Sequence, residues 1–171
     1  MASLRLLLPL FLLQFFNIPS GDAIIFYVPE IDHIEVVTSD NFTSVVFLAE
    51  HLTIMKFYAH WCGYSKRFIP HWKDFANETI LWHKNVLRVA SIDCANAQNH
   101  DICQKNQVYE YPVFRFFPAY GTLERGITAE NETSRSEKFM RRAIYFLETQ
   151  EKPPKTWPDL APYRYKNHLF F

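Results

Sequence analysis

Residues 57–66 read Phe-Tyr-Ala-His-Trp-Cys-Gly-Tyr-Ser-Lys, and the prediction of the whole fold starts from them. They end an apolar run, residues 52–59, whose length and aromatic content predict a buried central strand. A helix is expected next, so Cys62 falls where that helix begins. Unpaired N–H groups at a helix N-terminus favour a thiolate, which predicts that Cys62 is a nucleophile. Ser65 occupies the position where a second cysteine would complete a dithiol site.

Apolar segments of strand length alternate with segments of helical periodicity along the rest of the chain. The predicted strands are residues 34–37, 52–59, 85–93 and 112–118, with a weak edge strand within 119–133. The predicted helices are residues 41–50, 65–82, 95–107 and 134–151, and Pro70 is expected to kink the second of them. Residues 24–33 are predicted to form an extended lead-in that ends near Pro29. This alternation predicts an α/β fold.

Length and composition indicate one globular domain with a real core. The chain has 171 residues, of which 49% are hydrophobic and 17% aromatic. The formal net charge is zero, so no basic surplus points to nucleic acid, and we expect no nucleic-acid partner.

The N-terminal segment has the pattern of a secretory signal peptide. A short basic segment, residues 1–5, precedes an apolar run, residues 6–16, that is too short to span a bilayer as a helix. We expect cleavage near Ala23, which gives a signal peptide over 1–23, a domain over 24–151, and a proline-rich linker and tail over 152–171. No membrane span is expected after cleavage. The predicted location is the ER or Golgi lumen, or the extracellular space.

Three N-glycosylation sequons agree with a secretory location. They begin at Asn41, Asn77 and Asn131, and Asn131 is the best candidate because it lies in a polar segment.

The chain has three cysteines, Cys62, Cys94 and Cys103. In a secreted protein an odd count predicts one disulfide and one thiol that is free or paired with another molecule. A metal site built from Cys94, Cys103 and His100 would lack a fourth ligand, so no metal is expected. A purely structural, buried Cys62 is an alternative to the nucleophile.

An ordered set of motifs accompanies residues 57–63, namely residues 25–29, 68–73, 93–95, Cys103, 111–112, 116–117 and 156–158. Together they resemble the first thioredoxin domain of the quiescin-type sulfhydryl oxidases, over roughly residues 24–162. The resemblance implies a thioredoxin-like fold with a central mixed β-sheet flanked by helices. It also implies that Cys94 and Cys103 form a disulfide, and that Pro112 is a cis proline beside a groove for an extended client segment.

Members of that family are flavin-linked enzymes that make disulfides in client proteins. Their thioredoxin domain takes electrons from client thiols through a Cys-x-x-Cys pair and passes them to a separate FAD domain. Here Ser65 replaces the resolving cysteine, and the chain ends where the next domain is expected. The resemblance therefore implies monothiol exchange with client thiols or disulfides, impaired activity of the isolated chain, and no cofactor within it. The resemblance leaves open that a flavin-containing oxidase is a partner of this chain.

The sequence is also compatible with two other functions. The chain is alternatively a redox-inactive, chaperone-like module that binds clients at the Pro112 groove, or a truncated product of a longer oxidase.

Three residues near Cys62 are candidates for modulating its chemistry. Lys56 stands where thioredoxin-like enzymes usually carry a buried acid, and its ammonium would favour the thiolate unless it extends to the surface. Trp61 is expected either to shield the thiol and contact clients or to be a core aromatic residue. His60 either tunes Cys62 or is a solvated residue at the rim of the site, which is the favoured interpretation.

Overall fold

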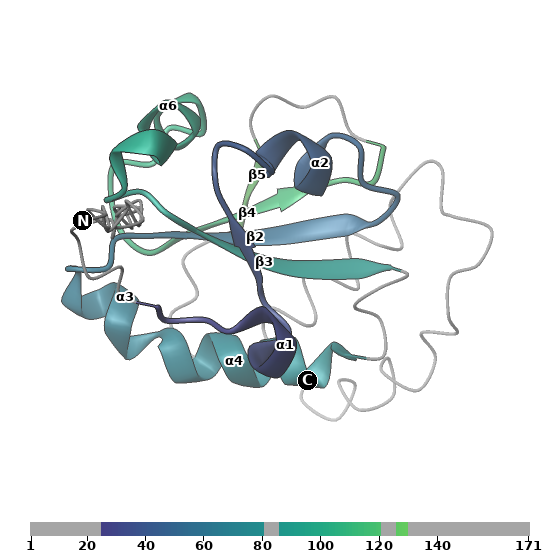
Figure 1. Cartoon of the computed structure of the whole chain (residues 1–171), viewed down its shortest axis with the longest axis horizontal. Helices are drawn as coiled ribbons and strands as arrows, with labels where there is room; N and C mark the ends of the chain where they lie inside the picture. Colours follow the sequence, from purple (N-terminus) through teal and green to yellow (C-terminus); the bar gives the residue numbers. More distant parts are fainter. Residues whose placement is uncertain (1–24, 81–85, 121–125, 130–171) are drawn as a thin grey trace, which may run out of the picture.

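The computed structural model describes residues 25–80, 86–120 and 126–129. Within these residues five strands form one mixed sheet in the order β1-β3-β2-β4-β5 (Figure 1). The strands are β1 (Glu35–Val37), β2 (Leu52–Tyr58), β3 (Leu87–Asp93), β4 (Val113–Phe117) and β5 (Ile127–Ala129). β3 pairs in parallel with β1 and β2, whereas β4 is antiparallel to both β2 and β5. The predicted α/β fold with a central mixed sheet is confirmed.

Helices cover both faces of the sheet. They are α1 (Pro29–Asp32), α2 (Phe42–Val46), α3 (Gly63–Arg67), α4 (Ile69–Glu78), the 3₁₀ helix η1 (Ala97–Asn99) and α6 (His100–Lys105). In the view of Figure 1, α2 and α6 lie above the sheet and α1 and α4 lie below it. Among the described residues no helix has the length and apolar character needed to cross a bilayer.

Strand β2 lies at the centre of the sheet, and all seven of its residues are buried. Its side chains alternate between two hydrophobic cores because successive residues of a strand point to opposite faces. Leu52, Ile54 and Tyr58 pack in the core that contains Trp72 and Phe75 of α4. The core on the other face contains Met55 and Phe57 together with Val45, Val46, Cys94, Cys103, Val113 and Phe117. Lys56 points to the α4 side, so a charged residue interrupts an otherwise apolar face.

The prediction of extended structure over residues 24–33 is wrong for α1. Pro29 stands in the first turn of this helix, where its missing N–H and fixed φ are favourable. The Asp32 carboxylate accepts the N–H of Val28 at 2.8 Å and pairs with Lys73 of α4 at 2.9 Å. The short helix is therefore held by its own side chain and by tertiary contact with α4.

The helix predicted over residues 65–82 is two helices, and it begins earlier than expected. α3 starts at Gly63 and ends before Phe68, and α4 follows with Pro70 in its first turn. The disturbance expected at Pro70 is thus a break just before it, since a helix tolerates proline in its first turn and not in its interior. The predicted helix 134–151, the signal segment 1–23 and the tail 152–171 lie outside the described residues.

Candidate active site at the end of strand β2

Cys62 lies at the start of α3, just beyond a tight turn at the end of β2. Its N–H donates to the carbonyl of Ala59 at 3.0 Å, and its backbone is extended, as at many helix N-caps. The thiol is free and half-buried, and its Sγ–H points to the carbonyl of Tyr111 at 3.6 Å. The alternative of a buried structural cysteine is therefore wrong.

Several donors act on the Cys62 sulfur. Partial burial raises the pKa of the thiol, but the N–H and hydroxyl of Ser65, the N–H of Tyr64 and the charge of Lys56 together hold the pKa below its ordinary value. The backbone donors belong to the first turn of α3, where N–H groups have no partner within the helix. This environment therefore raises the share of thiolate at Cys62 relative to an ordinary cysteine, and the thiolate is the nucleophilic form.

Ser65 is fully buried behind the thiol. Within the described residues its hydroxyl has no hydrogen-bond partner. A buried hydroxyl without a partner is costly, so a thiolate at Cys62 would supply the acceptor that this hydroxyl lacks. The position that would hold a resolving cysteine thus holds a potential donor to the sulfur.

Lys56 is fully buried beneath the site, so the alternative in which it extends to the surface is wrong. Its Nζ donates to the Tyr27 hydroxyl at 2.7 Å and to the Ser65 carbonyl at 3.1 Å. The same atom lies 5.5–5.6 Å from the ring centroids of Tyr27, Tyr58 and Phe68. Burial lowers the pKa of Lys56 to about 7, against an opposing pull from the Cys62 charge.

Tyr111 and Trp61 form the other side of the site. The Tyr111-Pro112 peptide bond is cis, and the Tyr111 carbonyl faces Cys62. Trp61 packs edge-on against the Tyr111 ring, with the centroids 5.9 Å apart, yet it remains 65% exposed. The alternative of Trp61 as a core aromatic residue is therefore wrong. Two further aromatic residues near the site, Tyr64 and Tyr109, are also exposed.

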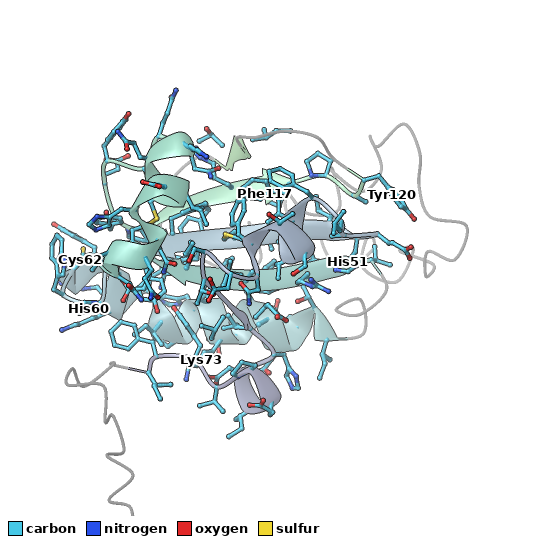
Figure 2. All side chains as sticks on the ribbon, turned by 45° about the horizontal axis from the view of Figure 1, so that its top comes forward. His51, His60, Cys62, Lys73, Phe117 and Tyr120 are labelled. Carbon is cyan, nitrogen blue, oxygen red and sulfur yellow. A yellow bond between two sulfur atoms is a disulfide. The ribbon has the colours of Figure 1, made fainter. Side chains whose placement is uncertain are left out.

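His60 binds Asp93, the last residue of β3. Its Nδ1 lies 2.8 Å from the carboxylate, while its side chain stays 37% exposed. His60 is thus partly exposed at the rim, and its ring is also paired with Asp93. That it tunes Cys62 stays a prediction. Figure 2 shows His60 and Cys62 at the same end of the molecule, with His51 and Tyr120 at the opposite end.

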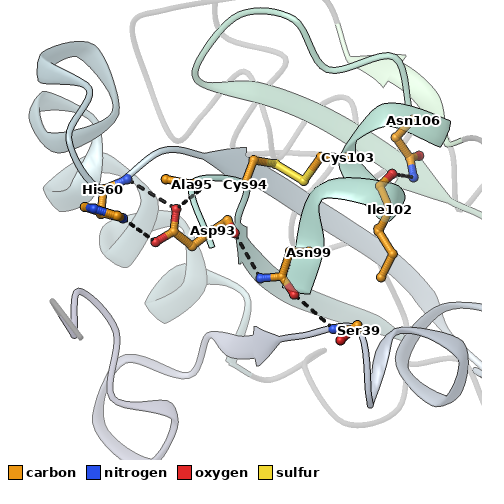
Figure 3. The surroundings of a disulfide bond; sticks show 9 residues. All are labelled: Ser39, His60, Asp93, Cys94, Ala95, Asn99, Ile102, Cys103 and Asn106. Atoms are coloured by element: carbon orange, nitrogen blue, oxygen red, sulfur yellow. Dashed lines mark hydrogen bonds and ion pairs between the residues drawn. A yellow bond between two sulfur atoms is a disulfide. The ribbon is translucent and has the colours of Figure 1, made fainter. Parts of the chain in front are cut away.

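Cys94 and Cys103 form a disulfide that ties the end of β3 to α6 (Figure 3). Both are buried, and their sulfurs are used in the S–S bond, so they do not serve as thiolate ligands with His100. Among the described residues no three His, Cys, Asp or Glu side chains converge as a metal site.

The sequons differ in their surroundings. Asn77 is exposed on α4. The Asn41 amide is engaged in its local turn, since its Nδ2 donates to the Val36 carbonyl at 3.1 Å and its Oδ1 accepts the Thr38 N–H at 2.8 Å. Asn131 lies outside the described residues. Glycosylation at all three remains a prediction.

Asp93, Tyr111 and Tyr27 also belong to this site and were not predicted from the sequence to do so. Asp93 could have been found, because β2 and β3 are parallel and Tyr58 stands opposite Asp93 in register. The carboxyl ends of neighbouring parallel strands lie together, so a polar residue ending β3 is expected beside the turn that follows β2. No local pattern marks Tyr27, which reaches Lys56 from 29 residues away.

Curated relatives of this chain include two sulfhydryl oxidases of Mus musculus. Sulfhydryl oxidase 1 is 29% identical over 131 residues, which are 77% of this chain and 17% of that protein. Sulfhydryl oxidase 2 is 32% identical over 112 residues, which are 64% of this chain and 16% of that protein. The chain thus spans less than a fifth of the length of these relatives.

Solved structures share the fold. The first thioredoxin domain of mouse protein disulfide-isomerase A4 is 23% identical with a TM-score of 0.59, and the match covers 81% of this chain and 93% of that domain. The J-Trx1 fragment of ERdj5 is 18% identical with a TM-score of 0.60, and the match covers 73% of this chain and 55% of the fragment. The family model described as Thioredoxin matches residues 33–142. With the Cys62 turn, the cis Pro112 and the mixed sheet in place, the chain belongs to the thioredoxin family.

Proposed function

We propose that this domain exchanges thiols and disulfides with client proteins through a monothiol site. Cys62 is the nucleophile, Ser65 stands at the resolving position and Pro112 borders the client groove. The observation that carries the proposal is the setting of Cys62, a free, half-buried thiol with a lowered pKa at a helix start. Similarity to sulfhydryl oxidases and to the thioredoxin domain of a protein disulfide-isomerase supports the same chemistry.

The reaction is a single exchange. The Cys62 thiolate attacks one sulfur of a client disulfide, the Cys62–client S–S bond forms, and the client S–S bond breaks. The departing client sulfur leaves as a thiolate and takes up a proton. The electrons are only redistributed among sulfurs, so this step needs no cofactor in the chain.

Release of the client depends on a second thiol from outside the site. Ser65 lies at the position from which a cysteine would attack the mixed disulfide, and a hydroxyl does not do so. We therefore propose a long-lived covalent complex that is resolved by a client thiol or a small thiol. Net oxidation of a client would require a disulfide donor, such as an oxidase partner.

A second candidate is a binding module that holds clients without covalent chemistry. It is favoured by the exposed aromatic side chains Trp61, Tyr64 and Tyr109 around the site. Such rings contribute apolar contact area to protein interfaces. In this alternative Cys62 is dispensable.

Trapping of mixed disulfides separates the two candidates. The full chain is incubated with a client whose disulfides have been scrambled, quenched with acid, alkylated and separated on non-reducing gels, beside Cys62→Ala. The exchange proposal expects thiol-sensitive adducts with the native chain and none with Cys62→Ala. Equal client retention by both proteins on a column, without adducts, would support the binding module instead.

A second variant tests the role of Ser65. Ser65→Cys is expected to convert the site to a dithiol and to give repeated insulin reduction in the presence of dithiothreitol. The native chain is expected to be far slower under the same conditions. If Ser65→Cys were inactive while Ser65→Cys with Lys56→Glu were active, the limiting change would lie at Lys56 and not at Ser65.

We also propose that the domain works in the secretory pathway. The buried disulfide between Cys94 and Cys103 fits an oxidising compartment, as does the predicted signal segment. Expression in cultured cells followed by glycosidase treatment tests this location. A mass shift that is lost in Asn131→Gln or Asn77→Gln supports it, whereas an unglycosylated chain in the cytosol contradicts it.

A further inference from the structure

The turn between β2 and Cys62 carries His60 two residues before the thiol, at the same end of the molecule (Figure 2). The hydrogen bond from the Cys62 N–H to the Ala59 carbonyl closes this turn at 3.0 Å, and His60 and Trp61 occupy its two middle positions. Their side chains go to different neighbours, since Trp61 packs on Tyr111 and His60 binds Asp93. The turn that leads to Cys62 therefore directs an aromatic side chain to Tyr111 and an imidazole to Asp93.

Asp93 is itself firmly held, so it fixes the imidazole. Its Oδ2 lies 2.8 Å from His60 Nδ1, and its Oδ1 accepts the N–H groups of His60 at 3.3 Å and Ala95 at 3.0 Å (Figure 3). The Asp93 backbone carbonyl accepts from Asn99 Nδ2 at 2.9 Å. A carboxylate on Nδ1 keeps the proton on that nitrogen, which leaves Nε2 to gain or lose a proton.

We propose that the His60–Asp93 pair is the general acid–base of the exchange reaction, with His60 protonating the client sulfur that leaves. This inference rests on the proposed function. As the Cys62–client S–S bond forms, the client S–S bond breaks and its electron pair goes to the departing sulfur, which takes the proton from His60 Nε2. In the reverse direction the neutral imidazole removes the proton from the incoming thiol, and the protein returns to its starting state.

Three other titratable groups near the pair, Lys56, Tyr58 and Tyr111, are less suited than His60 to donate the proton. Lys56 is buried below Ser65, with its Nζ bonded to Tyr27 and to the Ser65 carbonyl, so it does not reach a client. Burial and then the Asp93 charge raise the pKa of Tyr58, which stands opposite Asp93 in the sheet. Burial, Asp93 and Cys62 likewise raise the pKa of Tyr111.

Both tyrosines around the pair are therefore neutral in the physiological range, and the Asp93 carboxylate is the charge that pairs with the imidazole. An imidazole can both donate and accept a proton, as a general acid–base group must. Its exposed edge is open to a client, because the His60 side chain is 37% exposed and that of Asp93 only 22%.

The leaving group distinguishes proton donation from a general electrostatic effect. An alkyl thiolate is a poor leaving group and benefits from a proton, whereas a strongly acidic aromatic thiolate does not need one. The rate of mixed-disulfide formation is therefore measured with oxidised glutathione and with 5,5′-dithiobis(2-nitrobenzoic acid). Iodoacetamide alkylation of the same proteins reports the thiolate fraction of Cys62.

His60→Gln is expected to slow the reaction with oxidised glutathione at least about tenfold near neutral pH, and to flatten its pH profile. The reaction with the aromatic disulfide should stay unchanged, and so should alkylation. Asp93→Asn keeps an acceptor for the Ala95 N–H but removes the charge, and is expected to show the same selective loss, smaller in size. His100→Gln, on exposed α6, is the matched control and should match the native chain in every assay.

Equal slowing of both disulfides by His60→Gln would overturn the proposal, because it would indicate a change in Cys62 itself. Unchanged rates with both reagents would overturn it as well. Failure of the proposed function looks different, since native Cys62 would then react with neither disulfide.

Discussion

Two cysteines follow the carboxyl ends of the neighbouring strands β2 and β3, and they are in different chemical states. Cys94 continues strand β3, since its N–H donates to the Tyr58 carbonyl at 2.7 Å, and its side chain enters the core and pairs with Cys103. Cys62 follows β2 only after a tight turn that takes it out of the strand ladder to the start of α3. One cysteine is 3% exposed and oxidised, whereas the other is a half-buried free thiol.

The difference shows that backbone position decides what a cysteine does here. Cys94 extends a strand between packed layers, where apolar side chains and the Cys103 sulfur surround it, so its role is structural. A cysteine at the first turn of a helix meets N–H donors that favour its charged form. Both surroundings are built from neighbouring parallel strands, so the chemical contrast arises over a short distance at one end of the sheet.

The largest effect is expected from removing the disulfide. Cys94→Ala with Cys103→Ala opens a loop with a sequence separation of 9 residues. The chain-entropy model puts the loss in the free energy of unfolding at about 3 kcal/mol. Denaturant titration measures this loss, and iodoacetamide alkylation of the native variant should find Cys62 as reactive as before. A matching loss of Cys62 reactivity would contradict a division of roles between the two sites.

The next effect concerns the charge beneath Cys62. The pKa of Lys56 is lowered by burial to about 7 in the native state, whereas an unfolded lysine titrates near about 10.4. Between these values the unfolded state binds more protons, so the stability of the lysine form rises with pH. Relative to Lys56→Met, it should gain about 2 kcal/mol between pH 7 and pH 9.

Denaturant titrations at both pH values measure this gain, in a Cys62→Ala background that removes the titration of the thiol. Lys105→Met, exposed at the end of α6, is the control for loss of a lysine charge. If the stability difference between the lysine form and the Lys56→Met variant stayed constant with pH, Lys56 would have to keep its proton when buried.

The smallest effect is expected at Ser65. Ser65→Ala removes a donor to the Cys62 thiolate, so the pKa of Cys62 should rise and alkylation at neutral pH should slow by up to about fivefold, the equivalent of one hydrogen bond of about 1 kcal/mol. Lys56→Met should slow alkylation less, since the charge of Lys56 acts on the sulfur more weakly than the hydroxyl does. Ser44→Ala, on the exposed surface of α2, is the control. Faster alkylation of Ser65→Ala would contradict a donor role for the hydroxyl.

Much of the fold could be predicted from sequence because the strong signals agree. The apolar run over 52–59 and the aromatic run over 112–118 correspond to β2 and β4, both buried throughout. α1 was not predicted, since its stability comes from the Asp32 carboxylate and from Lys73, contacts that hydrophobic periodicity does not reveal. The break at Phe68 was not predicted either. The sequence shows that Pro70 disturbs a helix, but only the structure shows that Pro70 stands in the first turn of a separate helix.

The site was predictable in its sulfur chemistry but not in its polar partners. The position of Cys62 at a helix start follows from the local pattern. Asp93 could have been placed near the turn that follows β2, because β2 and β3 are parallel. Its pairing with His60 and the burial of Lys56 against Tyr27 are long-range side-chain contacts that hydrophobic periodicity does not reveal. Side chains with two plausible environments, such as Lys56 and Trp61, were the ones for which sequence reasoning left alternatives open, because both can be amphipathic.

The positions of Trp61 and Trp72 allow tryptophan fluorescence to report on the site separately from the core. Trp72 is fully buried, with its Nε1 donating to Ser91 at 2.8 Å, so its surroundings change only when the core opens. Trp61 is solvated and adjoins Cys62, so its indole exchanges water for protein whenever a client covers the thiol. A difference in emission between the native chain and Trp61→Phe isolates that one indole, and its shift to shorter wavelength follows client docking in real time.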